Sequence, residues 1–203
     1  MTTTRRGATA AMVGGALWAL LPAAFSVNAG QNSPHGTLEF VAGVFATWLF
    51  AVLAPALLLF AVRGTTAALE PGPLRAAATA VCTPGLAAIT FGMGIEAFTL
   101  TTAGVENDVG HLVFLLGVLV LVVGELLLGI AVLRRRRDGL ARSAAAAFVL
   151  ALPFGVGLAL LLSAVAPGSD TGFWVAMTVP TGIGWLLLGR AVLPRTAKAP
   201  VIV

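Results

Sequence analysis

Residues 112–137 read LVFLLGVLVLVVGELLLGIAVLRRRR, and this stretch decides the class of the protein. Its first 22 residues contain a single charged side chain, Glu125. As a helix they are long enough to cross a bilayer core about 30 Å thick. Four arginines follow directly, and positive charge of this kind is retained in the cytoplasm during membrane insertion. The stretch therefore predicts a transmembrane helix that ends on the cytoplasmic side.

The rest of the chain has the same character. Of 203 residues, 59% are hydrophobic and only 10% are charged, whereas soluble domains contain about 25% charged residues. Short polar connections separate the apolar segments and favour antiparallel neighbours in a compact bundle. The sequence predicts an all-α integral membrane protein, a bundle of six transmembrane helices forming one domain over residues 1–203. The expected spans are 8–27, 39–62, 76–101, 112–133, 143–166 and 172–193.

The basic residues predict the orientation of these spans. In a six-span arrangement all 12 lysines and arginines fall on one side, so that side is expected to be cytoplasmic. We therefore expect a multi-pass protein of the cell membrane with both termini in the cytoplasm. Because the basic residues mark the ends of apolar runs, they do not form the basic surface that nucleic-acid binding requires. They are Arg5, Arg6, Arg63, Arg75, Arg134, Arg135, Arg136, Arg137, Arg142, Arg190, Arg195 and Lys198.

Two features of the layout have alternative interpretations. The segment before Gly30 has the small residues of a signal-peptide cleavage site at Ala29, but its apolar run exceeds the 7–15 residues typical of such peptides. We expect the first helix to be retained. The odd-numbered spans open on a basic residue followed by alanines, and the even-numbered spans close on one, which indicates three hairpin repeats. Such repeats are common in transporters, although Ala/Leu-rich helices also resemble one another by chance.

Prolines and glycines predict how the helices pack. An interior proline removes a backbone hydrogen bond and kinks a helix, and several kinked helices can enclose a cavity. The fourth span instead has Gly110, Gly117 and Gly124 at heptad spacing, which favours close approach of another helix. We therefore expect a cavity among the kinked helices and a tight seam along the fourth span. The interior prolines are Pro22, Pro55, Pro84, Pro153 and Pro180.

Glu125 is the most informative acidic residue. It lies nine residues before Arg134, or about 13 Å along a helix, and so within the hydrocarbon region. A carboxylate at that depth is costly unless it is paired, protonated or hydrated. No basic residue lies equally deep, so we expect Glu125 to face the bundle interior and to be neutral, or else to face water. A hydrogen bond to Thr47 or Thr178 is the structural alternative to a functional role.

A second acidic group is expected near the outer boundary. Glu96 lies 21 residues from Arg75, about 31 Å along a helix, and Glu39 and His111 open their spans at the same level. We expect these three to approach one another, with Glu125 deeper on the same face of the fourth span as His111. Carboxylates in unlike environments can divide acid and base roles, so Glu125 and Glu96 are the catalytic candidates. Glu39, Glu96, His111 and Glu125 are the candidate binding residues.

No motif indicates a cofactor, and no metal site is expected. His35, Glu39, Asp108 and His111 could supply metal ligands from two outer loops, but their spacing matches no recognised signature. The single cysteine, Cys82, lies in an apolar segment and is expected to be a small buried hydrophobe.

Three functions remain open from the sequence. The first is binding or transport of a small or hydrophobic solute through an outward-facing site. In size and six-span layout the chain resembles the substrate-binding subunits of energy-coupling vitamin transporters. The second is an intramembrane acid/base enzyme acting on a lipid or isoprenoid, because size and buried acids are similar to those of small integral-membrane terpene cyclases. The third is an accessory subunit that binds a membrane-protein partner or forms a homo-oligomer.

Overall fold

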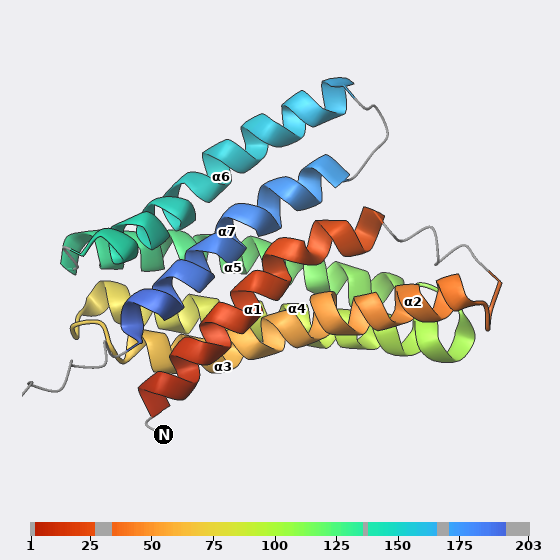
Figure 1. Cartoon of the computed structure of the whole chain (residues 1–203), viewed down its shortest axis with the longest axis horizontal. Coiled ribbons are helices and arrows are strands. Elements are labelled where there is room, and N and C mark those ends of the chain that lie inside the picture. The colour runs from red at the N-terminus through yellow and green to blue at the C-terminus, as the bar shows by residue number, and fades with distance from the viewer. Residues whose placement is uncertain (1–2, 27–33, 136–137, 166–170, 194–203) are drawn as a thin grey trace, which may run out of the picture.

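A computed structural model describes residues 3–26, 34–135, 138–165 and 171–193, and this part of the chain is all-helical. The second predicted span is continuous but has three pieces, with a π-helix between two α-helices. The elements are α1 (Thr3–Ser26), α2 (Leu38–Ala46), η2 (Thr47–Leu53), α3 (Ala54–Thr66), α4 (Pro73–Ala103), α5 (Asp108–Arg135), α6 (Gly139–Val165) and α7 (Thr171–Val192) (Figure 1).

The helices extend a few residues beyond several predicted spans because local caps, and not the edge of the apolar run, end them. Pro73 opens α4, where its missing N–H costs nothing. Asn107 Oδ1 accepts a hydrogen bond from the Gly110 amide at the start of α5. Asp138 Oδ1 accepts one from the Ala141 amide at the start of α6. α4 ends at Gly104, whose φ of 67° is the left-handed conformation that favours glycine.

The helices pack in chain order around a closed ring. α1 contacts α3, α3 contacts α4, and the series continues through α5 and α6 to α7, which packs back on α1 (Figure 1). In Figure 1, α6 diverges from α4 and α5 as it runs towards its C-terminal end. The ring follows from the short connections, which place consecutive helices antiparallel and adjacent.

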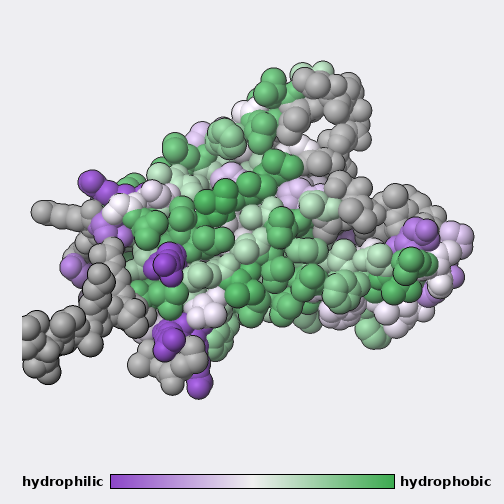
Figure 2. All heavy atoms as spheres, viewed as in Figure 1, coloured by the Kyte–Doolittle hydropathy of each residue, from purple (hydrophilic) through white to green (hydrophobic). Residues whose placement is uncertain are grey.

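Hydropathy identifies a multi-pass membrane protein. Five helical segments in the described part of the chain are long and apolar enough to cross a bilayer: Leu38–Thr66, Pro73–Ala103, Asp108–Arg134, Gly139–Leu158 and Trp174–Val192. α1, which begins with Arg5 and Arg6, is not among them. Large apolar side chains such as Phe91, Leu116 and Leu119 are exposed. Figure 2 shows hydrophobic surface over the middle of the molecule and hydrophilic residues towards its two ends.

The glycine seam predicted on the fourth span is confirmed. A Cβ added at Gly117 would lie 2.7 Å from the Ile89 amide nitrogen and 2.9 Å from the Gly85 carbonyl oxygen. One added at Gly124 would lie 2.7 Å from Cys82 Sγ. These distances are shorter than van der Waals contact, so α4 and α5 approach as closely as they do only because side chains are absent there.

Pro55 changes the helix that contains it. Proline has no N–H to donate to the carbonyl four residues earlier, and its ring crowds that carbonyl. The chain accommodates this with the π-helical segment Thr47–Leu53, and Pro55 then occupies the first turn of α3. The other interior prolines, Pro22, Pro84, Pro153 and Pro180, lie within α1, α4, α6 and α7.

The beginning of α1 and the end of α7 lie at the same end of the bundle. A Cβ added at Gly189 would lie 2.6 Å from the Ala8 carbonyl oxygen, and one at Gly7 would lie 2.5 Å from Gly64 Cα. The starts of α4 and α6 and the end of α5 lie at this end too, since consecutive helices alternate in direction. The described arginines therefore gather there, and we call it the basic end; the opposite end is the acidic end.

Candidate functional site

Glu125 lies in the interior of the bundle, as predicted, with 1% of its surface exposed. Its Oε1 accepts a hydrogen bond of 2.7 Å from Nε1 of Trp185 on α7. The Trp185 ring is itself fully buried, and Phe148 of α6 meets it edge-on with 5.5 Å between ring centroids. One buried acid thus connects α5 to α7 inside an aromatic environment.

The predicted hydrogen bond from Glu125 to Thr47 or Thr178 is wrong. The hydroxyl of Thr47 donates instead to the Gly43 carbonyl, and that of Thr178 donates to the Trp174 carbonyl. Both bonds lie within the threonine's own helix, a common way for a helical threonine to satisfy its hydroxyl. A buried indole N–H also needs an acceptor, so Trp185 is the residue that sequence reasoning missed. Its place five residues before Arg190 corresponds to about 7.5 Å along the helix, compared with about 13 Å for Glu125 from Arg134, so matched depth did not point to it.

Glu96 and His111 are brought together at the acidic end. His111 Nδ1 lies 3.4 Å from Glu96 Oε2, close enough for an ion pair when the imidazole is protonated. The His111 side chain is 49% exposed, whereas that of Glu96 is 10% exposed. Glu96 Oε2 is buried and has no hydrogen-bond partner among the described residues. An unpartnered buried carboxylate oxygen is unusual, because nearly all such atoms are satisfied in folded proteins.

Helix packing closes the space beneath this pair. A Cβ added at Gly110 would lie 2.8 Å from the Gly92 carbonyl oxygen and 3.2 Å from the Glu96 amide nitrogen. One added at Gly92 would lie 2.6 Å from the Phe114 amide nitrogen. α4 and α5 are therefore in backbone contact directly inward of Glu96. A ligand therefore cannot reach the free oxygen through the seam between α4 and α5.

The other acidic residues near this end, and the deeper Glu125, have different surroundings. Glu39 lies exposed in the first turn of α2. Glu106 precedes α5, is exposed, and lies near enough to Glu96 to interact with it electrostatically. Asp108 begins α5 and is also exposed. Glu125 is 14 residues further along α5 than His111, about 21 Å away, so it forms a second location and not the floor of the same one.

Aromatic rings continue from His111 into the bundle. The rings of His111 and Phe114 have centroids 6.0 Å apart, and those of Phe114 and Trp174 are 5.3 Å apart. Phe114 is 1% exposed, while Trp174 is partly exposed. α5 and the start of α7 therefore present apolar rings beside the Glu96–His111 pair.

Two apolar cavities lie on the sides of the bundle. One, of ≈ 630 Å³, lies between α6 and α7 and is lined by apolar side chains that include Pro153, Pro180, Phe154 and Ile183. The other, of ≈ 580 Å³, lies among α1, α3 and α4 and includes Phe60 and Arg63. The prolines of α6 and α7 thus border a groove on the outer surface of the ring.

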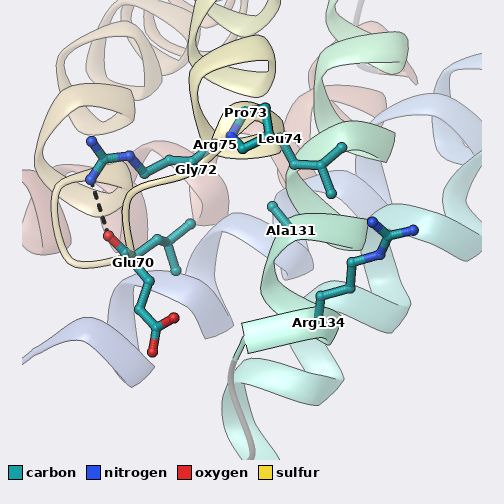
Figure 3. Close-up of a pocket in the computed structure, with 8 residues that line it drawn as sticks. Glu70, Gly72, Pro73, Leu74, Arg75, Ala131 and Arg134 are labelled. Atoms are coloured by element: carbon teal, nitrogen blue, oxygen red, sulfur yellow. Dashed lines mark hydrogen bonds between the residues drawn. The ribbon is translucent and has the colours of Figure 1, made fainter.

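A smaller cavity of ≈ 120 Å³ lies at the basic end, between the α3–α4 connection and the end of α5. Glu70, Arg75 and Arg134 line it, and Figure 3 shows the two arginines pointing in different directions. Arg75 Nη1 donates a hydrogen bond of 3.1 Å to the Leu69 carbonyl. This arginine therefore holds the connection in place. None of these three cavities is lined by Glu96, His111 or Glu125.

Within the described ranges, no three His, Cys, Asp or Glu side chains gather closely enough to hold a metal ion. Fold and hydropathy define a multi-pass membrane protein with one buried acid at its centre and one beneath a histidine at its acidic end. No protein-family model matches the chain, and no curated protein or solved structure matches it either.

Proposed function

We propose that this protein binds a small or hydrophobic solute at the Glu96–His111 pair, from the outer side of the cell membrane, and carries it as a binding or transport protein. The observation that supports this proposal is the buried, unpartnered Oε2 of Glu96. An acceptor without a donor is costly in an apolar environment. A solute N–H or O–H would satisfy it, and the half-exposed His111 side chain is the group that lies against this oxygen.

The proposed topology places this site outside. In this topology α1 is the first of six spans and is not cleaved from the protein. Every basic residue then lies on one side of the membrane. The positive-inside rule then puts the basic end and both termini in the cytoplasm. The chain is built in this proposal from three hairpins, α1 with α2–α3, α4 with α5, and α6 with α7. Of these, α4–α5 and α6–α7 pack extensively.

The α6–α7 groove suits the hydrophobic part of the proposal. Its lining is apolar and it opens to the outside of the ring, where lipid chains or an apolar solute in the bilayer would meet it. It is also a surface on which a membrane-protein partner or a second copy of the chain would pack. The groove is separate from Glu96, so ligand entry from the bilayer and from the outer aqueous side would be independent.

An acid/base enzyme acting on a lipid or isoprenoid is the second candidate. Its support is the aromatic environment of Glu125, which resembles the setting in which a buried carboxyl group can act as an acid. However, Glu125 is 1% exposed and already accepts a bond from Trp185. A substrate would have to displace Trp185 to reach it. The Glu96–His111 pair lies beneath a half-exposed side chain and is therefore favoured.

The test is to identify small molecules that remain bound to purified protein. Wild type, Glu96→Gln and the control Glu39→Gln would be purified in nanodiscs of one lipid composition, denatured and compared by mass spectrometry. Glu39 is the matched control because it is an exposed carboxylate at the same end. We expect a molecule present in wild type and Glu39→Gln and depleted in Glu96→Gln. Identical small-molecule content in all three proteins, including none, would overturn the proposal.

A further inference from the structure

The geometry points to a small organic cation, a protonated amine with an apolar body, as the solute class that occupies the Glu96–His111 pair. This inference rests on the proposed function and deepens it by specifying charge. Three observations carry it: the charge balance of the acidic end, the free oxygen of Glu96 beneath an exposed side chain, and the aromatic rings next to it.

Among the residues that the structure describes, the acidic end has carboxylates and no lysine or arginine. Residues 7–62, 76–133 and 143–189 contain no lysine or arginine. Glu96, Glu106, Asp108 and Glu39 all lie at the helix ends there, and His111 is the basic group that faces Glu96 from α5. A surface with one sign of charge over a low-dielectric interior attracts ions of the opposite sign. An anionic solute would therefore be repelled from this end, and a cationic one would be attracted to it.

The free oxygen defines where the cation binds. Glu96 Oε2 is buried, lacks a hydrogen-bond partner and lies 3.4 Å from His111 Nδ1. That contact lacks the geometry of a hydrogen bond, so the histidine rests against the oxygen without satisfying it. Exposed side chains change rotamer readily, and rotation of His111 would uncover the oxygen. An ammonium N–H would then donate a charge-assisted hydrogen bond, which is roughly twice as strong as a neutral one.

The adjacent rings explain why the cation would have an apolar body. Phe114, which is 1% exposed, lies beside His111 and packs on the partly exposed Trp174, so Trp174 is the ring that a ligand would contact. Aromatic faces attract cations and also bury apolar groups. Because α4 and α5 are in backbone contact at Gly92 and Gly110, the ligand cannot extend inward. Its apolar part must lie outward or sideways, towards Trp174.

A bare metal ion fits the same place poorly. The described residues supply no group of three metal-ligating side chains, and hard divalent cations require six or more oxygen ligands. A monocation that uses one carboxylate and an aromatic wall needs no such group.

The test compares three probes of similar size: benzylammonium, benzyl alcohol and benzoate. Binding to wild type, Glu96→Gln and Glu39→Gln in zwitterionic nanodiscs would be measured at pH 8 by calorimetry and thermal unfolding. We expect benzylammonium to bind wild type and Glu39→Gln, with an affinity lower by about tenfold or more in Glu96→Gln. Because His111 only covers the oxygen, His111→Ala should bind benzylammonium at least as tightly as wild type.

The outcomes separate the two proposals. Glu96-dependent binding of benzyl alcohol or benzoate that equals or exceeds that of benzylammonium would overturn the cation inference and keep the binding site. Binding of benzylammonium that is equal in wild type and Glu96→Gln would overturn the cation inference as well, and the co-purification experiment would decide the site on its own. If Glu96→Gln did not fold, loss of binding in His111→Ala, in which Glu96 is intact, would overturn the inference.

Discussion

Trp185 Nε1 donates a hydrogen bond of 2.7 Å to Glu125 Oε1, and this bond joins two helices that α6 separates in the ring. Helix association within a bilayer gains little from the hydrophobic effect and depends on packing and interhelical hydrogen bonds. Two other tryptophans follow the same pattern. Trp18 donates to Thr181 Oγ1, and Trp48 donates to Thr101 Oγ1. The indoles therefore act as connections between helices throughout the bundle.

Replacing Trp185 with phenylalanine should destabilise the bundle. Phenylalanine keeps an aromatic ring but is smaller than the indole and has no N–H, so Glu125 would become a buried group without its donor. The expected loss is about 1–3 kcal/mol of unfolding free energy, measured by denaturant unfolding in one detergent. Trp48→Phe is the matched control because its bond to Thr101 is exposed, and its effect should stay within about 0.5 kcal/mol. Equal losses of unfolding free energy in the two variants would show that the buried bond of Trp185 stabilises the protein no more than the exposed bond of Trp48.

Gly92→Val should loosen the contact between α4 and α5. The added Cβ would lie 2.6 Å from both the Gly110 carbonyl oxygen and the Phe114 amide nitrogen, and backbone atoms cannot rotate away. Gly94→Val, two residues along the same helix, meets nothing within 4 Å. The two substitutions change helix propensity equally. The difference between their unfolding free energies therefore reports packing, and we expect it to be about 1–3 kcal/mol. A thermal unfolding midpoint that is the same in both variants would contradict the close packing of the seam.

Much of the fold could be predicted from the sequence because hydrophobic length and one-sided basic charge are strong signals in membrane proteins. The glycine seam was predictable for a similar reason, since Gly110, Gly117 and Gly124 repeat on one face. The π-helix before Pro55 was not predicted. A proline indicates that a hydrogen bond is lost, but not whether the chain kinks or widens in response.

The site was predictable only in part. Their matched depth correctly predicted that Glu96 and His111 lie together, and the depth of Glu125 correctly predicted that it faces the interior of the bundle. Depth gives the position of a residue along its helix but not the direction in which its side chain points within the bundle. It could therefore not identify Trp185 as the partner of Glu125. Depth also grouped Glu39 with the pair; Glu39 lies exposed in the first turn of α2, and its approach to Glu96 and His111 stays a prediction. The sequence predicted that His111 and Glu125 lie on one face of their helix. In the structure, His111 contacts Glu96 on α4 and Glu125 contacts Trp185 on α7.

The orientation of the chain can be tested with single cysteines in a Cys82→Ala background. Val105→Cys, on the exposed α4–α5 connection, and Gln31→Cys should react with a membrane-impermeant maleimide on intact cells. Ala67→Cys, exposed beside the basic end, should react only after permeabilisation. The expected result follows from the one-sided distribution of all 12 basic residues. Labelling of Ala67→Cys in intact cells, with protection of Val105→Cys, would invert the proposed topology.

The connection between Glu125 and Trp185 also predicts how the two positions depend on each other. Glu125→Gln keeps an oxygen that can accept the indole N–H, so its unfolding free energy should remain near that of wild type. Glu125→Leu has no acceptor and leaves the Trp185 N–H unpaired, which should cost about 1–3 kcal/mol.

The double variant Glu125→Leu/Trp185→Phe has no unpaired polar group at this position. Replacing both partners with apolar groups can be nearly neutral, so the double variant should be more stable than the sum of the single losses predicts. The expected coupling energy, about 0.5–3 kcal/mol for residues in direct contact, would be measured by a double-mutant cycle in one detergent. Strictly additive losses would mean that the two side chains are independent and that α5 and α7 are held together by packing alone. Should Glu125→Gln instead abolish solute binding or transport at unchanged stability, Glu125 would have a proton-handling role in addition to this structural one.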